Sequence, residues 1–189
     1  DAAEELQKTH QLNAFRSWLE DNNCYLFTIN GFPYGQFHGV RVKEQVYAPD
    51  WTQPSRLHYT QTLFQILNSL APVDIPISVS TLPGSFKEFI HSKDQEDLIF
   101  KHIWDLVDFL EKMQQESGRS DLTLGLEPEP LGWFENTEET IRFFDRLQSF
   151  RPGDDRWKAF IGVNYDTCHF AVEYEDAFQS LTRFHALGI

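Results

Sequence analysis

The chain has 189 residues, of which 41% are hydrophobic and 15% aromatic, and its formal net charge is −13. This length and composition suffice for one domain with a sizeable core. The sequence contains no run of 18 or more apolar residues, so no membrane-spanning helix is predicted. The acidity disfavours a nucleic-acid partner, because phosphate backbones are bound by clustered Lys and Arg. An acidic chain is instead suited to binding a cation.

The first residues, Asp1–Glu5, do not form a positively charged segment followed by an apolar one, so no signal peptide is predicted. Cys24 and Cys168 are too few for a disulfide scaffold, and we expect a reducing, cytoplasmic environment.

Hydrophobic periodicity predicts helices and strands in alternation. We expect a helix from Ala2 to Asn22, a strand buried on both faces over Cys24–Ile29, and then a long, aromatic-rich loop over Asn30–Gln53. Loops of this length are usually functional or disordered. Because the aromatic residues argue against disorder, we expect the loop to be ordered and to cover a site. The later elements expected are, in order, a helix from Pro54 to Leu70, a strand over Ile75–Ser80, a helix over about Asp94–Gln115, a strand over Leu122–Leu126, a helix capped by Asn136, a strand over Phe160–Tyr165, a helix over about Glu175–Ala186, and the start of a further strand at Gly188.

Apolar strands that alternate with amphipathic helices indicate βα units and a parallel sheet. Polar residues follow the strands directly, at their carboxyl ends, which is where (β/α) barrels hold their active sites. Eight barrel strands need about 250 residues, and only four are expected here. We therefore predict that residues 1–189 form a single domain that is an interior fragment of a TIM-type (β/α)₈ barrel.

Two pairs of residues at the ends of predicted strands could carry chemistry. Glu127 and Glu129 follow Leu122–Leu126, and their spacing of two directs both carboxylates to one side if the chain stays extended. Asp166 and His169 follow the last strand, and a carboxylate with an imidazole suits Zn²⁺, Mn²⁺, Fe²⁺ or Co²⁺. The alternative for Glu127 and Glu129 is that both are surface residues without a function. The alternative for Asp166 is a helix cap, and for His169 a packed side chain.

A family resemblance favours the metal interpretation. The run from Phe160 to Ala171 closely resembles the endonuclease IV signature, and its strand followed by Asp-x-x-His recurs across the xylose isomerase-like superfamily. Leu124–Glu127 resembles the preceding strand of that superfamily, which ends in a metal-binding Glu. The resemblance implies a xylose isomerase-like TIM barrel, with the four strands as its third to sixth. It also implies a divalent metal (Mn, Zn, Mg, Co or Fe) bound by Glu127, Asp166 and His169.

The chain departs from endonuclease IV at two positions. Phe32 and Leu82 stand where that family has metal-binding histidines, so a three-zinc, DNA-cleaving site is not expected. The ligands of barrel strands seven and eight lie outside these residues, and we expect an incomplete site to bind metal weakly.

The chain also resembles the EboE-type family of metabolite-traffic barrel proteins, through Asn30–Gly35, Phe37–Gly39, Val42–Glu44, Tyr47 and Pro49–Trp51. On this basis the candidates for holding an anionic or polyol substrate are Tyr34, His38, Arg41 and Lys43. An equally weighted alternative is that these residues only tie down the long loop.

The function expected first is a metal-dependent isomerase or epimerase of a sugar, sugar phosphate or other polyol. Glu127 would act as ligand and acid/base, and Glu129 would support it or transfer protons. The alternatives are a phosphoesterase related to endonuclease IV and a non-catalytic metabolite-binding barrel in a trafficking system. The partner expected is a small sugar-like molecule, with no nucleic acid and no membrane span, and the oligomeric state is left open.

Overall fold

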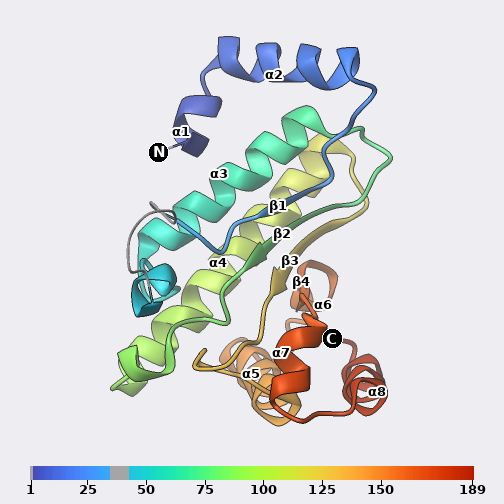
Figure 1. Cartoon of the computed structure of the whole chain (residues 1–189). Coiled ribbons are helices and arrows are strands. Elements are labelled where there is room, and N and C mark those ends of the chain that lie inside the picture. Colours follow the sequence, from blue (N-terminus) through green and yellow to red (C-terminus); the bar gives the residue numbers. More distant parts are fainter. Residues whose placement is uncertain (1, 35–42) are drawn as a thin grey trace.

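The computed structural model describes residues 2–34 and 43–189, and a four-stranded parallel sheet lies at its centre (Figure 1). The strands are β1 (Thr28–Asn30), β2 (Ile77–Thr81), β3 (Leu122–Leu126) and β4 (Ile161–Val163). Their order in the sheet is the same as their order in the sequence. The chain is thus a mixed α/β protein whose consecutive strands lie side by side and point in one direction.

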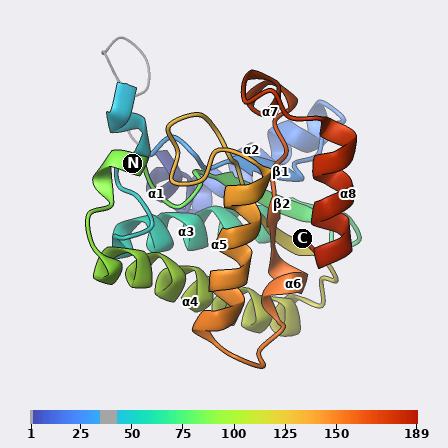
Figure 2. The ribbon, with the colours of Figure 1, turned by 90° about the horizontal axis from the view of Figure 1, so that it is seen from below.

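The longer helices α3 (Pro54–Leu70), α4 (Lys93–Ser117) and α5 (Thr137–Phe150) form a layer along one side of this sheet (Figure 2). The other helices are α1 (Ala2–Leu6), α2 (Thr9–Asp21), α6 (Trp157–Phe160), α7 (Thr167–Val172) and α8 (Ala177–Leu187), and two 3₁₀ helices are η1 (Lys43–Tyr47) and η2 (Lys87–Phe89). Helix α3 contacts α2 and α4, α4 contacts α5, and α5 contacts α8. The longer helices α2, α3, α4, α5 and α8 therefore follow one another in space in the order of the chain, as the strands do.

The two faces of the sheet differ in character. In β2 and β3 every second residue is buried, and the register aligns Val79 with Leu124 on the helix-covered face. The residues between them are small or polar and only half-buried, such as Ser80 beside Gly125. Apolar burial against α3, α4 and α5 stabilises one face, at about 25 cal/mol per Å² of apolar surface removed from water. The opposite face is polar and open.

Local signals explain the elements predicted best. Pro54 occupies the first turn of α3, where its missing N–H costs nothing. The Ser92 side chain accepts a hydrogen bond from the Gln95 amide at the start of α4, and Gly118 ends that helix in the left-handed conformation. Asn136 caps α5 as predicted, by accepting a hydrogen bond from the Glu139 amide at 3.0 Å.

Three predictions near the chain ends need correction. The predicted helix from Ala2 to Asn22 is divided into α1 and α2. Only Thr28–Asn30 of the first predicted strand region pairs, and Cys24–Phe27 is mostly exposed, because β1 has a neighbour on one side only. Gly188 does not begin a strand but ends α8 in the left-handed conformation. Among the described residues, no helix is both long and apolar enough to cross a membrane.

Two loops at the carboxyl end of the sheet are joined to each other. Phe86, after β2, and Gly132, after β3, form an isolated antiparallel bridge. On either side of it the Trp133 amide donates to the Ser85 carbonyl at 2.8 Å, and the Lys87 amide donates to the Leu131 carbonyl at 2.9 Å. The Lys87 ammonium also pairs with the carboxylates of Glu135 and Glu139. The bridge therefore holds the segment that follows β3 against the segment that follows β2.

Candidate metal centre

The carboxyl ends of β3 and β4 bring Glu127 and the Asp166–His169 segment together. The backbone pairing continues past both strands, because the Glu127 amide donates to the Thr81 carbonyl at 2.9 Å and the Asn164 amide donates to the Leu126 carbonyl at 2.7 Å. Glu127 and Asn164 are thus cross-strand neighbours. Both follow a residue that faces the helix layer, so both lie on the open face.

Glu127, Asp166 and His169 converge as the sequence predicted. One ligand atom from each lies within 4.8 Å of the others, and all three side chains are half-buried. The Glu127 carboxylate is 4.0 Å from His169 Nδ1, and the Asp166 carboxylate is 3.5 Å from His169 Nε2. Two carboxylates and an imidazole at these separations can close on a divalent ion with bonds of about 2.0–2.2 Å after small side-chain movements.

Asp166 also caps α7, which was the alternative role considered for it. Its Oδ1 accepts hydrogen bonds from the Cys168 amide at 2.7 Å and the His169 amide at 3.3 Å. Partial burial alone would raise the pKa of Asp166, but the Cys168 amide and the nearby His169 outweigh it and hold the pKa below its usual value. The cap fixes one carboxylate oxygen and leaves Oδ2 directed toward His169.

The orientation of His169 is fixed by the backbone. Its Nδ1 lies 3.1 Å from the Pro128 carbonyl oxygen, which can only accept a hydrogen bond. The proton therefore resides on Nδ1, and Nε2 keeps its lone pair on the side of Asp166. Metal-binding histidines usually have this arrangement, in which the second ring nitrogen donates to a carbonyl or carboxylate.

Asn164 contacts the third candidate ligand and was not singled out from the sequence. Its Nδ2 donates to Glu127 Oε2 at 2.6 Å. An Asn at the end of a short strand is unremarkable in a sequence, and only the pairing of β3 with β4 places it opposite Glu127.

Glu129 is half-buried like the three candidate ligands and lies beside Tyr47 of η1. Burial raises the pKa of Glu129, the charges of Glu127 and Asp166 add to the rise, and Tyr47 and His169 oppose it. Burial and the neighbouring Glu129 carboxylate raise the pKa of the Tyr47 hydroxyl, so that it stays protonated, and this hydroxyl donates to the Pro130 carbonyl oxygen at 3.5 Å. Glu129 is thus a carboxylate that holds its proton more readily than a free glutamate, next to the three converging side chains.

The described parts of the Asn30–Gln53 loop lie at the carboxyl end of the sheet, as expected. Trp51 is fully buried there and its indole N–H donates to Thr81 Oγ1 at 3.1 Å. Tyr34 packs on Tyr59 of α3, with 4.9 Å between the ring centroids, so its described contacts are with a helix and not with the metal candidates.

The other substrate candidates of this loop are not placed by the structure. His38 and Arg41 lie outside the described residues, and Lys43 begins η1 without a described side chain.

His102 is buried in α4, and its Nδ1 lies 2.8 Å from the Trp51 carbonyl oxygen, so it packs in the interior away from the candidate ligands. Cys168, in the first turn of the short α7, is exposed.

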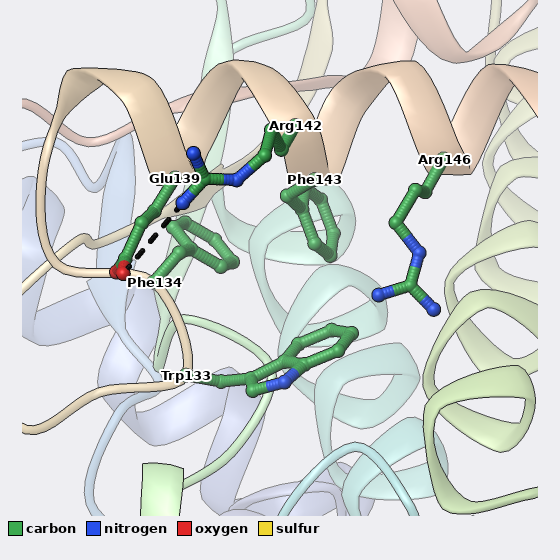
Figure 3. Close-up of a pocket in the computed structure, with 6 residues that line it drawn as sticks. All are labelled: Trp133, Phe134, Glu139, Arg142, Phe143 and Arg146. Atoms are coloured by element: carbon green, nitrogen blue, oxygen red, sulfur yellow. Dashed lines mark ion pairs between the residues drawn. The ribbon is translucent and has the colours of Figure 1, made fainter. Parts of the chain in front are cut away.

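A separate hollow of about 150 Å³ lies outside this centre, between the loop after β3 and helix α5 (Figure 3). It is lined by Trp133, Phe134, Glu139, Arg142, Phe143 and Arg146. Both of its arginines have carboxylate partners, since Arg142 lies 3.8 Å from Glu139 and Arg146 pairs with Glu96. None of the candidate metal ligands lines it.

Comparisons with known proteins add no assignment. No protein-family model matches the chain, and neither a curated protein nor a solved structure is similar to it.

Proposed function

We propose that this protein binds one divalent metal ion through Glu127, Asp166 and His169. The observation that carries the proposal is that each of the three side chains is anchored through one atom and free at another. Glu127 Oε2 is held by Asn164, Asp166 Oδ1 by backbone amides, and His169 Nδ1 by the Pro128 carbonyl. The remaining atoms are left for a cation, and among them Asp166 Oδ2 lies 3.5 Å from His169 Nε2, while Glu127 Oε1 lies 4.0 Å from Nδ1 of the same ring. Ligands held in this way lose little conformational freedom when an ion binds.

We further propose that the sheet and its helices are part of a (β/α)₈ barrel. The parallel strands follow one another without reversal, whereas an open doubly wound sheet reverses its order at a switch point. One continuous helix layer on one side also supports a barrel segment. The candidate ligands then occupy the carboxyl end of the strands, where barrel enzymes hold their active sites.

The activity supported best is isomerisation or epimerisation of a sugar, sugar phosphate or related polyol. A bound divalent ion would polarise two neighbouring substrate oxygens. Glu129, with its raised pKa, is suited to take up and return a carbon-bound proton. The buried Tyr47 lies beside Glu129, and its hydroxyl donates to the Pro130 carbonyl oxygen at 3.5 Å.

Phosphoester hydrolysis with two or three metals has less support. Among residues 2–34 and 43–189, Glu127, Asp166 and His169 are the one group of potential ligands that converges. Phe32 and Leu82, at the positions where endonuclease IV has histidines, are buried in the hydrophobic core. Phe32 and Leu82 therefore pack in the core and bind no metal. Glu127, Asp166 and His169 together provide ligands for a single ion.

Metal titration followed by an exchange assay tests the proposal. We expect Mn²⁺ or Co²⁺ to bind at one ion per chain, weakly if further barrel strands supply ligands, and His169→Ala to abolish binding. His185→Ala on the exposed face of α8 is the matched control. In D₂O the metal-bound protein should catalyse deuterium exchange next to the carbonyl of an aldose or ketose.

Each contrary outcome is distinct. Two or three ions per chain would favour the phosphoesterase, and one ion without exchange on a broad panel of sugars would favour a metabolite-binding barrel. Absence of binding at millimolar metal would refute the metal centre.

A further inference from the structure

Asn164 makes a directed contact with a candidate metal ligand from the neighbouring strand. Its side-chain nitrogen donates to Glu127 Oε2 at 2.6 Å, whereas Glu127 Oε1 lies 4.0 Å from His169 Nδ1. The amide orientation is unambiguous while Glu127 is ionised, because a carboxylate only accepts hydrogen bonds and the amide oxygen would be repelled. The two oxygens of one carboxylate therefore have different partners.

The backbone beneath Asn164 is shaped for this contact. A Cβ atom added at Gly125 would lie 3.1 Å from the Asn164 Cβ and 3.4 Å from its backbone nitrogen. Gly125 is two residues before Glu127 on the same open face of β3. A larger residue at this position would push Asn164 away from the carboxylate. The glycine thus provides the space in which the amide reaches its acceptor.

We infer that Asn164 determines how Glu127 coordinates the metal, and through this which ion the centre prefers. The inference depends on the proposed metal centre. Because Oε2 accepts a hydrogen bond from Asn164 at 2.6 Å, its electron density is partly committed, and Glu127 would coordinate an ion chiefly through Oε1. One-oxygen coordination suits small ions with bonds of about 2.0–2.2 Å, such as Zn²⁺, Mn²⁺ or Mg²⁺. Ca²⁺ takes six to eight oxygens at longer distances and gains from carboxylates that chelate through both oxygens.

Asn164 is therefore a positioning residue that discriminates against Ca²⁺. A purely structural role, in which the amide only ties β4 to β3, makes a different prediction. In that case loss of the amide would lower the free energy of unfolding and weaken the binding of every ion by the same factor. The ratio of two affinities separates the roles, because a general loss of stability cancels from it.

The test compares Mn²⁺ and Ca²⁺ binding to residues 1–189 by calorimetric titration. In the wild type we expect Mn²⁺ to bind more tightly than Ca²⁺. Asn164→Ala should weaken Mn²⁺ binding about 10-fold, the lower range for loss of a group that orients a ligand, and leave Ca²⁺ binding unchanged or tighter. Gly125→Ala, which keeps the amide but displaces it, should shift the ratio in the same direction. Asn13→Ala on the exposed face of α2 is the matched control.

The outcomes distinguish this inference from the proposal on which it depends. If the wild type binds Mn²⁺ and the folded Asn164→Ala variant keeps the wild-type ratio of Mn²⁺ to Ca²⁺ affinity, the inference is overturned and the metal centre stands. If the wild type binds neither ion, the metal centre is refuted and this inference with it. Circular dichroism establishes whether each variant is folded. If Asn164→Ala is unstable, the ratio of Mn²⁺ to Ca²⁺ affinity is measured on Gly125→Ala instead.

Discussion

Asp166 has two roles that substitutions can separate. Asp166→Ala removes the acceptor of two backbone amides at the start of α7 together with a metal ligand. Loss of an N-cap typically costs about 1 kcal/mol, which lowers the melting temperature of a protein of this size by about 2–4 °C. Asp166→Asn keeps an oxygen that can cap the helix but loses the charge. We expect its melting temperature without metal to stay within about 2 °C of the wild type, since Asn and Asp are similar caps.

The metal dependence of melting then reports the ligand role. An ion at 100 times its dissociation constant stabilises the wild type by about 2.7 kcal/mol, or roughly 5–11 °C. If Asp166→Asn weakens binding 100-fold, the same metal concentration adds only about 0.4 kcal/mol. Thermal unfolding followed by circular dichroism, with EDTA and with Mn²⁺, measures both effects.

The pH dependence has a defined sign. The pKa of Asp166 is lowered in the folded state, so its stabilising contribution is present above the ordinary value of 3.8 and is lost as the pH falls below it. The reasoning would be refuted if Asp166→Asn destabilised the metal-free protein as much as Asp166→Ala, or if it kept the full metal-induced rise in melting temperature.

Two further predictions concern stability. Burial raises the pKa of Glu129, so the wild type loses stability as the pH rises from 4.5 through the raised value. In urea unfolding, Glu129→Gln should therefore gain stability relative to the wild type over this pH window. A difference in the free energy of unfolding that stays constant from pH 4 to 8 would contradict this prediction. In the same urea unfolding assay, Asn136→Ala should lower the free energy of unfolding by about 1 kcal/mol, because the cap of α5 is lost. Asn136→Asp keeps a capping oxygen and should not lower it. Equal losses in both variants would argue against the cap.

The sequence predicted those parts of the fold that depend on local signals. Helix α3 begins at Pro54 and ends at Leu70 as predicted, and β3 spans Leu122–Leu126 as predicted, because proline and strict alternation act within a few residues. The convergence of Glu127, Asp166 and His169 was also predicted, since parallel strands end at one edge of a sheet.

What the sequence did not predict depends on tertiary pairing. The contact of Asn164 with Glu127 follows from the register of β4 on β3, which one strand does not encode by itself. The pairing of Tyr47 with Glu129 joins residues 82 positions apart and depends on the path of a loop. The exposure of Cys24–Phe27 reflects the edge position of β1, whereas the apolar composition of the segment is that of an interior strand.

The bridge between Phe86 and Gly132 makes the lengths of two loops interdependent. An insertion between β2 and Phe86 would move the register of the bridge and pull on the segment that carries Glu127 and Glu129. A compensating insertion after β3 would be needed to restore it. Exchange of these loops between related proteins should therefore succeed when both are exchanged together, and a single exchange should misplace the carboxylates even where the new loop itself folds.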